Sequence, residues 1–462
     1  MAKIKTMHVC QECGHESPRW LGRCPSCLQW NTMVEEVREP EGPPSVASAR
    51  SGYGAAAGGE PIRLGDIEML AEERVKSDIA ELDMVLGGGF VPGGIVMLGG
   101  DPGIGKSTLS LQVAGHFASK GLEVLYISGE ESLTQIRLRA NRLGVDSKAL
   151  WVVGETSVER VEKLLSEKRP ALAVIDSIQT LQSESLTSAP GSVAQLREVT
   201  SRLTQIGKGF SIPIVLVGHV TKEGAIAGPK VLEHMVDTVL YFESQNAGAF
   251  RLLRAVKNRF GSTNEVGIFE MRGDGLHEVG NPSAAFLEGR PTDAPGSVVV
   301  PILEGTRPLM VEVQALVSPT NYGPPRVTAV GVDTNRVILL LNILEKRTGA
   351  KVAGMDVFIN VAGGLKLMEP AADLAIAMAI LSSFYERAVP SDLAIFGELG
   401  LTGEVRAVAQ AARRVAETRK LGFKRVLGPK ANIQEVKDEL KESALLGAQH
   451  VAEARRLLFG DR

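Results

Sequence analysis

The sequence predicts an α/β protein whose largest domain is a mostly parallel sheet with helices on both faces. Short apolar runs that suit buried strands alternate along it with amphipathic stretches of helical length. A phosphate-binding loop joins one of these strands to the helix that follows, over residues 100–107. Four cysteines near the N-terminus are a third observation, and they predict a separate small metal domain.

Length and composition limit the classes of protein to consider. A chain of 462 residues is long enough for two or three domains, and 44% hydrophobic with 23% charged residues suits globular domains. The net charge of −3 means that any affinity for nucleic acid must come from local patches. No apolar run has the length of a membrane span, and the N-terminus lacks the apolar core of a signal peptide. We therefore expect a cytoplasmic protein, bacterial or organellar, with no membrane partner.

All four cysteines lie within the first 27 residues, with the spacing C-x₂-C-x₁₀-C-x₂-C. Two close pairs, each on a tight turn, can place four thiolates tetrahedrally around one Zn²⁺. The alternative of two disulfides is disfavoured in a reducing cytoplasm. Residues 1–37 are therefore predicted to form a four-cysteine zinc finger whose folding depends largely on the metal, and residues 38–60 a flexible linker rich in Gly, Pro, Ala and Ser. The predicted ligands are Cys10, Cys13, Cys24 and Cys27.

The domain predicted over residues 61–285 carries the alternating pattern. Its first strand-like runs lie at 94–99, 122–128, 171–176 and 213–218. Amphipathic stretches separate these runs at 106–120, 157–168 and 192–208. Further strand-like runs with short connections predict a β-meander that extends the sheet, at 236–243, 250–258, 265–271 and 275–279.

A second region of strands and helices follows a stretch that is interrupted by prolines, and we assign residues 286–462 to a C-terminal α+β domain. Strand-like runs are expected at 297–303, 309–317, 327–331 and 356–361. Helices are expected at 333–347, 371–385 and 408–421.

The phosphate-binding loop reads Gly-Asp-Pro-Gly-Ile-Gly-Lys-Ser and matches G-x-x-x-x-G-K-[ST] in full. The glycines let the backbone curl until its N–H groups, together with the positive end of the next helix, cradle a polyphosphate. Lys106 is expected to reach the β- and γ-phosphates, and the Ser107 hydroxyl to bind Mg²⁺. The predicted ATP-binding residues are Gly100, Asp101, Pro102, Gly103, Ile104, Gly105, Lys106, Ser107 and Thr108.

Hydrolysis needs a second carboxylate for Mg²⁺ and a group that orients water. Asp176 ends a buried strand and is the predicted Walker-B carboxylate, with the cap of a following helix as the alternative. Glu130 and Glu131 follow another strand. We choose Glu130 to orient water, although either residue fits, as does an acidic first helical turn. His219 follows a third strand, either as a sensor of the γ-phosphate or as a structural residue.

Five segments resemble the bacterial RadA/Sms family of DNA-repair proteins: GGDPGIGKST, YISGEES, VIDSIQT, GHVTKEG and the pentapeptide KNRFG at 257–261. The cysteine domain fits the same family, and the similarity covers essentially the whole chain. The resemblance implies a RecA-like ATPase core that acts on recombination intermediates. It also implies single-stranded and branched DNA as ligands, branch migration by a hexameric ring, and a RecA-type recombinase filament as partner.

A basic segment includes that pentapeptide: Arg251, Arg254, Lys257 and Arg259 lie within nine residues without an acidic residue. In a regular strand, 251, 257 and 259 share one face. We assign Lys257 to catalysis at the neighbouring subunit's nucleotide, and Arg259 either to that nucleotide or to DNA. A solvated charged edge is the alternative. The candidate motif is Lys257, Asn258, Arg259, Phe260 and Gly261.

Residues 297–462 resemble the proteolytic domain of Lon, with the local cues at 363–373 and 397–408. Lon proteases use a Ser–Lys dyad. Ala371 stands where the serine would follow Pro370, and alanine also occupies 412, where the lysine would fall. We therefore expect a Lon-protease-like fold without peptidase activity. Eight Lys or Arg between 403 and 430 form either a surface for DNA or ring assembly, or an ordinary soluble face.

Together these features predict a DNA-dependent ATPase of homologous recombination that uses zinc, magnesium and ATP. The alternative is an ATP-switched scaffold that recruits repair or replication partners without translocation.

Overall fold

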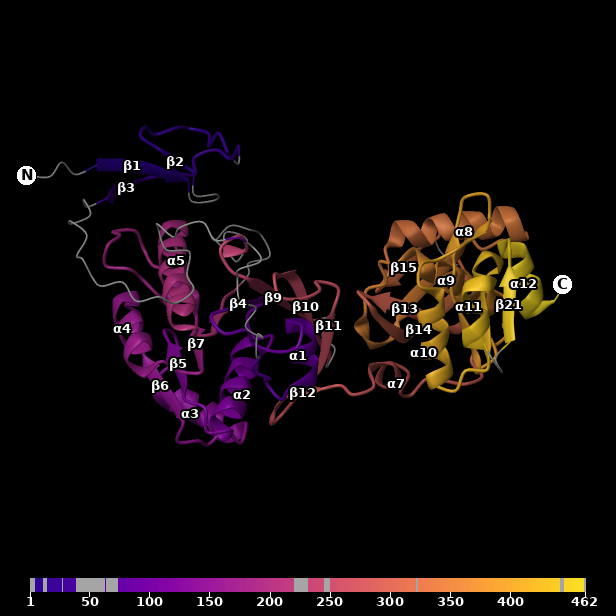
Figure 1. The fold of residues 1–462 in the computed structure, drawn as a ribbon. Coiled ribbons are helices and arrows are strands. Elements are labelled where there is room, and N and C mark those ends of the chain that lie inside the picture. The colour runs from indigo at the N-terminus through magenta and orange to yellow at the C-terminus, as the bar shows by residue number, and fades with distance from the viewer. Residues whose placement is uncertain are drawn as a thin grey trace, which may run out of the picture. The chain divides into compact units, whose positions relative to one another are not determined.

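The computed structural model describes residues 5–10, 15–26, 28–38, 63, 74–219, 232–244, 250–320, 323–440 and 444–460. The chain divides into two compact units (Figure 1). Unit 1 contains Met1–Ser244 and Arg251–Glu278, and unit 2 contains Gln245–Phe250 and Val279–Arg462. The domain limits inferred from the sequence, after residues 37, 60 and 285, stay predictions.

A small antiparallel sheet lies at the N-terminus of unit 1. Its strands are β1 (Lys5–Cys10), β2 (Glu16–Ser17) and β3 (Met33–Arg38), in the order β2-β1-β3. Cys10 and Cys24 are buried in one cluster with Met33. The two described cysteines thus share the only apolar centre that this short segment shows among its described residues.

The main sheet of unit 1 has nine strands in the order β12-β11-β10-β9-β4-β8-β7-β5-β6. Its parallel half confirms the predicted fold class. These strands are almost wholly apolar because helices cover both faces of a parallel sheet. The pattern missed β6, a short edge strand that is only partly buried. The parallel strands are β4 (Ile95–Gly100), β5 (Val124–Ser128), β6 (Leu150–Gly154), β7 (Leu172–Asp176) and β8 (Ile214–Val217).

Two apolar clusters lie on opposite faces of this sheet, as the alternation along β4 shows. Val96 and Leu98 belong to one cluster, with α1, α2 and α3, whereas Ile95 and Met97 belong to the other, with α4 and α5 (Figure 1). Successive side chains of a strand point to opposite faces, so the sheet is covered on both sides. The elements are α1 (Ala80–Leu86), α2 (Lys106–Ser119), α3 (Leu133–Arg142), α4 (Val158–Lys168), α5 (Val193–Phe210) and the 3₁₀ turn η2 (Ile178–Thr180).

The predicted meander extends the sheet beyond β4, but one of its strands is irregular. A β-bulge in β10 separates Ala255 from Lys257. Arg251 lies opposite Ser244 and Lys257 opposite Val239, which are five residues apart in β9 and therefore on opposite faces. The prediction that 251 and 257 share a face is wrong, because the bulge adds one residue to the alternation. The strands are β9 (Thr238–Ser244), β10 (Phe250–Asn258), β11 (Val266–Arg272) and β12 (Gly275–Glu278).

Unit 2 contains a mixed seven-stranded sheet in the order β15-β16-β14-β13-β17-β20-β21 and a small β18-β19 sheet. Helix α9 is apolar on nearly every side and packs on β13 and β14. The strands are β13 (Ser297–Glu304), β14 (Arg307–Pro319), β15 (Val327–Val330), β16 (Met355–Val361), β17 (Leu393–Ile395), β18 (Glu398–Leu399), β19 (Val405–Arg406), β20 (Arg425–Pro429) and β21 (Ala444–Ala448). The helices are α7 (Pro282–Phe286), α8 (Thr334–Thr348), α9 (Asp373–Phe384), α10 (Ala411–Lys420), α11 (Ile433–Leu440) and α12 (Val451–Phe459).

Two helices of unit 2 differ from their predicted ranges. The helix expected over 371–385 is divided into the 3₁₀ turn η4 (Pro370–Ala372) and α9. The helix expected over 408–421 begins only at Ala411, because Gln410 has a left-handed backbone with φ of 56°.

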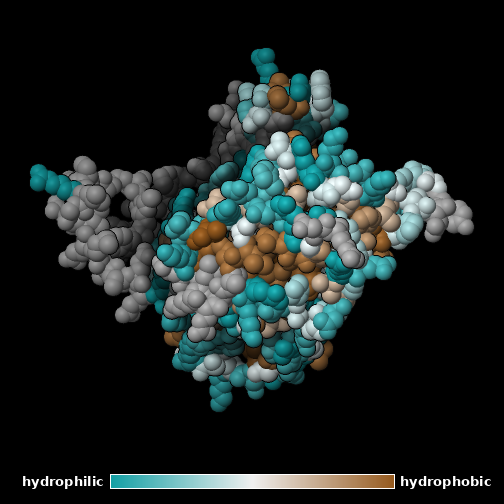
Figure 2. All heavy atoms as spheres, turned by 90° about the vertical axis from the view of Figure 1, so that its right-hand side faces the viewer, coloured by the Kyte–Doolittle hydropathy of each residue, from teal (hydrophilic) through white to brown (hydrophobic). Residues whose placement is uncertain are grey.

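Apolar side chains gather in the middle of the face shown in Figure 2, with hydrophilic side chains around them. Leu316 and Phe358 are both exposed and lie directly opposite each other in β14 and β16. Within the described residues, no helix is both long and apolar enough to span a bilayer.

Candidate nucleotide-binding site

The phosphate-binding loop connects β4 to α2, as the sequence predicts. Gly100 and Gly105 have φ values of 148° and 118°, which L side chains rarely adopt. A Cβ on Gly100 would lie 2.6 Å from the carbonyl oxygen of Phe242, and one on Gly105 2.8 Å from Cε of Met271. Backbone conformation therefore requires glycine at both positions, and the close approach of the Phe242 backbone also requires it at Gly100.

Lys106 is buried at the start of α2, with 3% of its surface exposed. Its Nζ donates to the carbonyl oxygens of Gly100 at 2.8 Å and Asp101 at 2.9 Å, and lies 3.2 Å from Nδ1 of His219. Burial lowers the pKa of Lys106 to about 8, against the opposing effect of the charges on Asp176, Asp101 and Glu130. The lysine therefore lies in a buried site with acidic groups around it.

Asp176 is the last residue of β7 and is 8% exposed. Tyr126, from the adjacent strand β5, donates its hydroxyl to Oδ2 of Asp176 at 2.7 Å. The cap of the following 3₁₀ turn is Ser177 and not Asp176, so the alternative role as a helix cap is not met. The Asp176 carboxylate and the Ser107 hydroxyl, in the first turn of α2, are hard oxygen donors of the kind that Mg²⁺ prefers.

The two glutamates after β5 face different partners. Glu130 accepts a hydrogen bond from the Ser177 hydroxyl, and its Oε2 lies 3.8 Å from Nε2 of His219. Glu131 instead forms an ion pair with Arg139 of α3. Helix α3 begins after both residues, with Ser132 as its cap and no acid in its first turn. Neither Glu130 nor Glu131 therefore lies in the first turn of a helix, so that alternative explanation for the two glutamates is wrong.

His219 lies two residues after the end of β8, and its backbone oxygen accepts a hydrogen bond from Gln179 at 3.1 Å. Its ring contacts both Lys106 and Glu130. Four polar residues that are far apart in sequence thus meet at the carboxyl ends of parallel strands, where ligands bind in open α/β sheets. They are Lys106, Glu130, Asp176 and His219.

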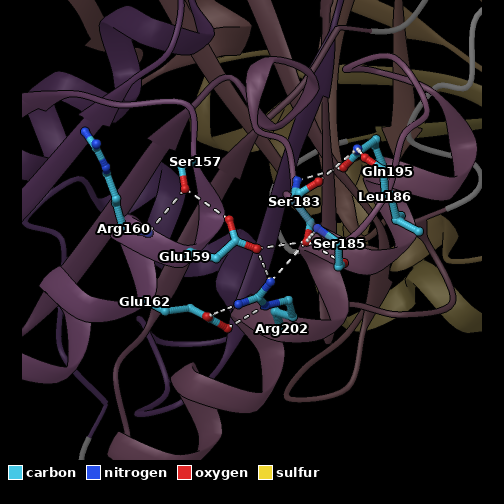
Figure 3. A network of polar contacts seen from close by, with 9 residues as sticks. All are labelled: Ser157, Glu159, Arg160, Glu162, Ser183, Ser185, Leu186, Gln195 and Arg202. Atoms are coloured by element: carbon cyan, nitrogen blue, oxygen red, sulfur yellow. Dashed lines mark hydrogen bonds and ion pairs between the residues drawn. The ribbon is translucent and has the colours of Figure 1, made fainter. Parts of the chain in front are cut away.

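A polar network holds the segment that leads from β7 to α5 (Figure 3). Arg202 of α5 forms ion pairs with Glu159 and Glu162 of α4 and donates to the Ser183 hydroxyl at 3.0 Å. Gln195 is 1% exposed and accepts from the backbone N–H of Ser183 at 2.8 Å. It also donates to the carbonyl oxygens of Ser183, Leu186 and Ser188.

The KNRFG motif lies near the amino end of β4, whereas the phosphate loop follows the carboxyl end of the same strand. Asn258 pairs with Thr238, which pairs with Val96 near the start of β4. Four residue steps separate Val96 from Gly100, which is roughly 13 Å along a strand. The motif therefore lies far from the phosphate loop of its own subunit.

The five motif residues divide into two groups. Lys257 Nζ donates to the backbone oxygens of Glu233 and Val236 at 2.7 and 2.8 Å, and Arg259 pairs with Asp237 at 3.1 Å. Burial and the neighbouring Arg259 charge lower the pKa of Lys257.

The other three residues hold the turn. Asn258 donates to the carbonyl of Val85 and accepts from the backbone N–H of Phe260. A Cβ on Gly261 would lie 3.0 Å from Cα of Gly87.

Half of the predicted zinc ligands are described. The Cys10 N–H donates to the carbonyl oxygen of His15, and the Cys24 N–H donates to that of Gln29, both at 2.9 Å. Both cysteine side chains are buried, and thiols fit the soft ligand set of Zn²⁺. Cys13 and Cys27 lie outside the described residues. In the part of the chain that is described, no group of three or more possible metal ligands gathers.

In unit 2, Ala371 is buried in η4, where a Lon-type serine would stand. Arg414 is 1% exposed and forms a buried ion pair with Glu369. It therefore does not belong to the basic surface expected over 403–430. Arg406, Arg425 and Lys420 on that surface pair with Glu404, Asp392 and Glu417. Arg413 and Lys420 are exposed on α10.

Family models match three parts of the chain: an AAA domain over 60–225, a rubredoxin metal-binding domain over 8–35, and subunit ChlI of Mg-chelatase over 327–432. The DNA repair protein RadA of Bacillus subtilis is 52% identical over 461 residues, which is the full length of both chains. The chain belongs to the RadA family of DNA repair proteins. The RadA proteins of Halalkalibacterium halodurans and Listeria monocytogenes are 53% and 51% identical, over 94% and 100% of each chain.

Membership of the RadA family agrees with the architecture of this chain. A RecA-like ATPase core carries a zinc ribbon before it and a Lon-like domain after it. The chain aligns with two of these RadA proteins over the full length of each. The sequence did not identify three residues that contact the site: Tyr126, Ser177 and Gln179. The strand pattern places them in or near the sheet but does not show which side chains they contact.

Proposed function

We propose that this chain is a DNA-dependent ATPase of homologous recombination and DNA repair, which binds single-stranded DNA and promotes branch migration. The observation that carries the proposal is the meeting of Lys106, Glu130, Asp176 and His219 beside the phosphate loop. Membership of a family of DNA repair proteins supports DNA as the ligand that the ATPase acts on.

The ATPase residues have distinct proposed roles. The phosphate-loop amides and Lys106 would hold the β- and γ-phosphates, and the Ser107 and Asp176 oxygens would hold Mg²⁺, which would neutralise charge that develops on the phosphates. Glu130 orients the attacking water, because its carboxylate points to the end of β7 whereas Glu131 pairs with Arg139. His219 contacts both Lys106 and Glu130 and is placed to respond to the γ-phosphate.

Lys257 acts in trans in this proposal. It lies at the end of the sheet that is remote from its own phosphate loop, so a nucleotide that it contacts belongs to a neighbouring subunit. This arrangement requires a homo-oligomer, for which a hexameric ring is the expected form. Arg259, whose side chain is 52% exposed, serves the same nucleotide or the DNA backbone.

The proposed setting is the cytoplasm, with single-stranded and branched DNA as ligands and a RecA-type recombinase filament as partner. The basic residues that stay exposed on unit 2, such as Arg413 and Lys420, are candidates for a further DNA contact. Peptidase activity is not expected, because Ala371 has no nucleophile.

The test is ATP turnover with and without single-stranded DNA at low ionic strength. We expect DNA to stimulate the intact chain and Lys106→Ala to abolish turnover in both conditions. An unchanged rate, together with no binding of oligonucleotides, would contradict a DNA-dependent motor. DNA-stimulated turnover without movement of a branched substrate would instead favour the ATP-switched scaffold.

A further inference from the structure

Tyr126 is a buried side chain that the proposed ATPase roles leave unused. It is 1% exposed and lies in β5, between β7 and the edge strand β6. Tyr126 pairs with Val174, and Asp176 lies two residues further along β7, on the same face of the sheet. The tyrosine ring therefore extends along this face, and its hydroxyl meets Oδ2 of Asp176 at 2.7 Å.

This hydroxyl is the donor in its bond to Asp176. A tyrosine phenol carries its proton at neutral pH, so it donates to the ionised carboxylate across the 2.7 Å contact. Ionised carboxylates only accept hydrogen bonds, and the geometry of a short bond to a charged acceptor is narrow. Among the described residues, only Tyr126 donates a hydrogen bond to the Asp176 side chain.

We propose that Tyr126 is a positioning residue: it occupies Oδ2 of Asp176 and so fixes the carboxylate with Oδ1 left for the metal that would accompany the nucleotide. This inference rests on the proposed function, because it concerns the Mg²⁺ that Asp176 and Ser107 would hold. Outer partners of this kind orient ligating carboxylates, and their loss typically weakens metal affinity by 10- to 100-fold.

A purely structural tyrosine is the competing explanation. Its hydroxyl would then matter only because a buried polar group needs a partner. Loss of the hydroxyl would lower the melting temperature of the protein and weaken nucleotide binding equally with and without metal. The dependence on Mg²⁺ therefore separates the two explanations.

The test is Tyr126→Phe in the full-length chain, with a fluorescent ATP analogue titrated at fixed Mg²⁺ concentrations and in EDTA. The substitution keeps the ring that fills the core and removes only the hydroxyl. We expect the Mg²⁺ concentration for half-maximal binding to rise about tenfold. Affinity in EDTA should change less than about twofold. Tyr385→Phe makes the same chemical change in unit 2 and should leave both quantities unchanged.

A double-mutant cycle makes the assignment sharper. If the hydroxyl acts through the carboxylate, Tyr126→Phe has no further effect on the Mg²⁺ dependence of Asp176→Asn, which itself loses most of that dependence. The cycle, like the single variant, is read by binding and not by turnover. Circular dichroism melts establish that each variant is folded at the assay temperature.

Two results would overturn the positioning role. One is an unchanged Mg²⁺ midpoint for Tyr126→Phe, and the other is an equal loss of affinity in EDTA and in Mg²⁺. Failure of the proposed function looks different, since the unmodified chain would then bind the analogue without any response to Mg²⁺.

Discussion

At the residue scale, the choice between Glu130 and Glu131 shows what contacts add to spacing. Both glutamates follow β5, and no rule of sequence separates them. The structure separates them by partner, since Glu130 meets Ser177 and His219 whereas Glu131 meets Arg139. Only Glu130 contacts the residue that follows β7, the strand that carries the predicted Walker-B carboxylate.

We predict that Glu130→Gln lowers ATP turnover at least about 100-fold, because loss of a group that orients or deprotonates water typically has an effect of this size. Binding of a fluorescent ATP analogue should change less than about threefold. Steady-state turnover and equilibrium binding measure the two effects. The matched control is Glu131→Gln, which should keep most turnover and lose about 1 kcal/mol of stability with its partly buried ion pair. The reverse ranking of the two variants would show that the assignment is wrong.

At the element scale, the Arg202 network joins α4, α5 and the segment after β7 (Figure 3). Burial alone would raise the pKa of Glu159, but hydrogen bonds from the backbone, Ser183 and Ser157, with the charge of Arg202, lower it overall. A carboxyl whose pKa is lower in the folded protein stabilises the fold above its unfolded pKa of about 4.3. That contribution is lost as the pH falls through the folded pKa.

We therefore predict that Arg202→Met destabilises unit 1 by about 2 kcal/mol at pH 7, between the values typical of exposed and buried pairs. The difference from the unmodified protein should shrink as the pH falls below about 4, where Glu159 begins to protonate in both proteins. Urea unfolding at pH 7 and at about pH 3 measures it.

The control is Arg160→Met on α4, since the Arg160 side chain is 76% exposed and its pair with Glu155 spans 3.4 Å. That variant should be within about 0.5 kcal/mol of the unmodified protein. An Arg202→Met effect that is equally small, or that grows on acidification, would contradict the role given to the network.

The bulge in β10 is the second lesson at the scale of elements. The two-residue period of a regular strand predicted that residues 251 and 257 share one face of the sheet. One extra residue in β10 places them on opposite faces. The bulge places Lys257 opposite Val239, on the side of the sheet that faces α4 and α5. No local signal in the sequence marks this position, because Ala, Val and Lys all fit a regular strand.

At the scale of the whole molecule, a trans-acting Lys257 requires neighbouring subunits. We predict that Lys106→Ala and Lys257→Ala are each inactive in ATP turnover, and that a mixture of the two regains part of the activity. In a mixed ring, some interfaces join the phosphate loop of a Lys257→Ala subunit to Lys257 of a Lys106→Ala subunit. Both groups are intact at such an interface. Turnover across a titration of one variant against the other, with sedimentation to follow assembly, tests this.

Two observations would contradict action in trans. A mixture that sediments as one mixed oligomer but stays inactive at every ratio is the first. Full activity of Lys257→Ala alone is the second.

The zinc finger provides a prediction that is independent of the ATPase. Cys24 is fully buried beside Cys10, so Cys24→Ser should abolish bound zinc and unfold the small N-terminal sheet. The nine-stranded sheet has its own apolar clusters, so its melting transition and nucleotide binding should persist. Metal analysis and thermal melts measure both. Zinc content that does not fall would show that the predicted ligand set is wrong.

The sequence by itself determined the α/β class, the phosphate loop and the family, because these depend on local spacing. Glycines and a lysine at set intervals, paired cysteines and the period of apolar residues can all be read within short segments. Only the tertiary structure decided that Glu130 rather than Glu131 meets β7, that Tyr126 holds Asp176, and that Arg414 is buried. These outcomes depend on how strands and helices pack in the folded chain, which brings together residues 45 to 50 positions apart in the sequence. No short segment contains that information.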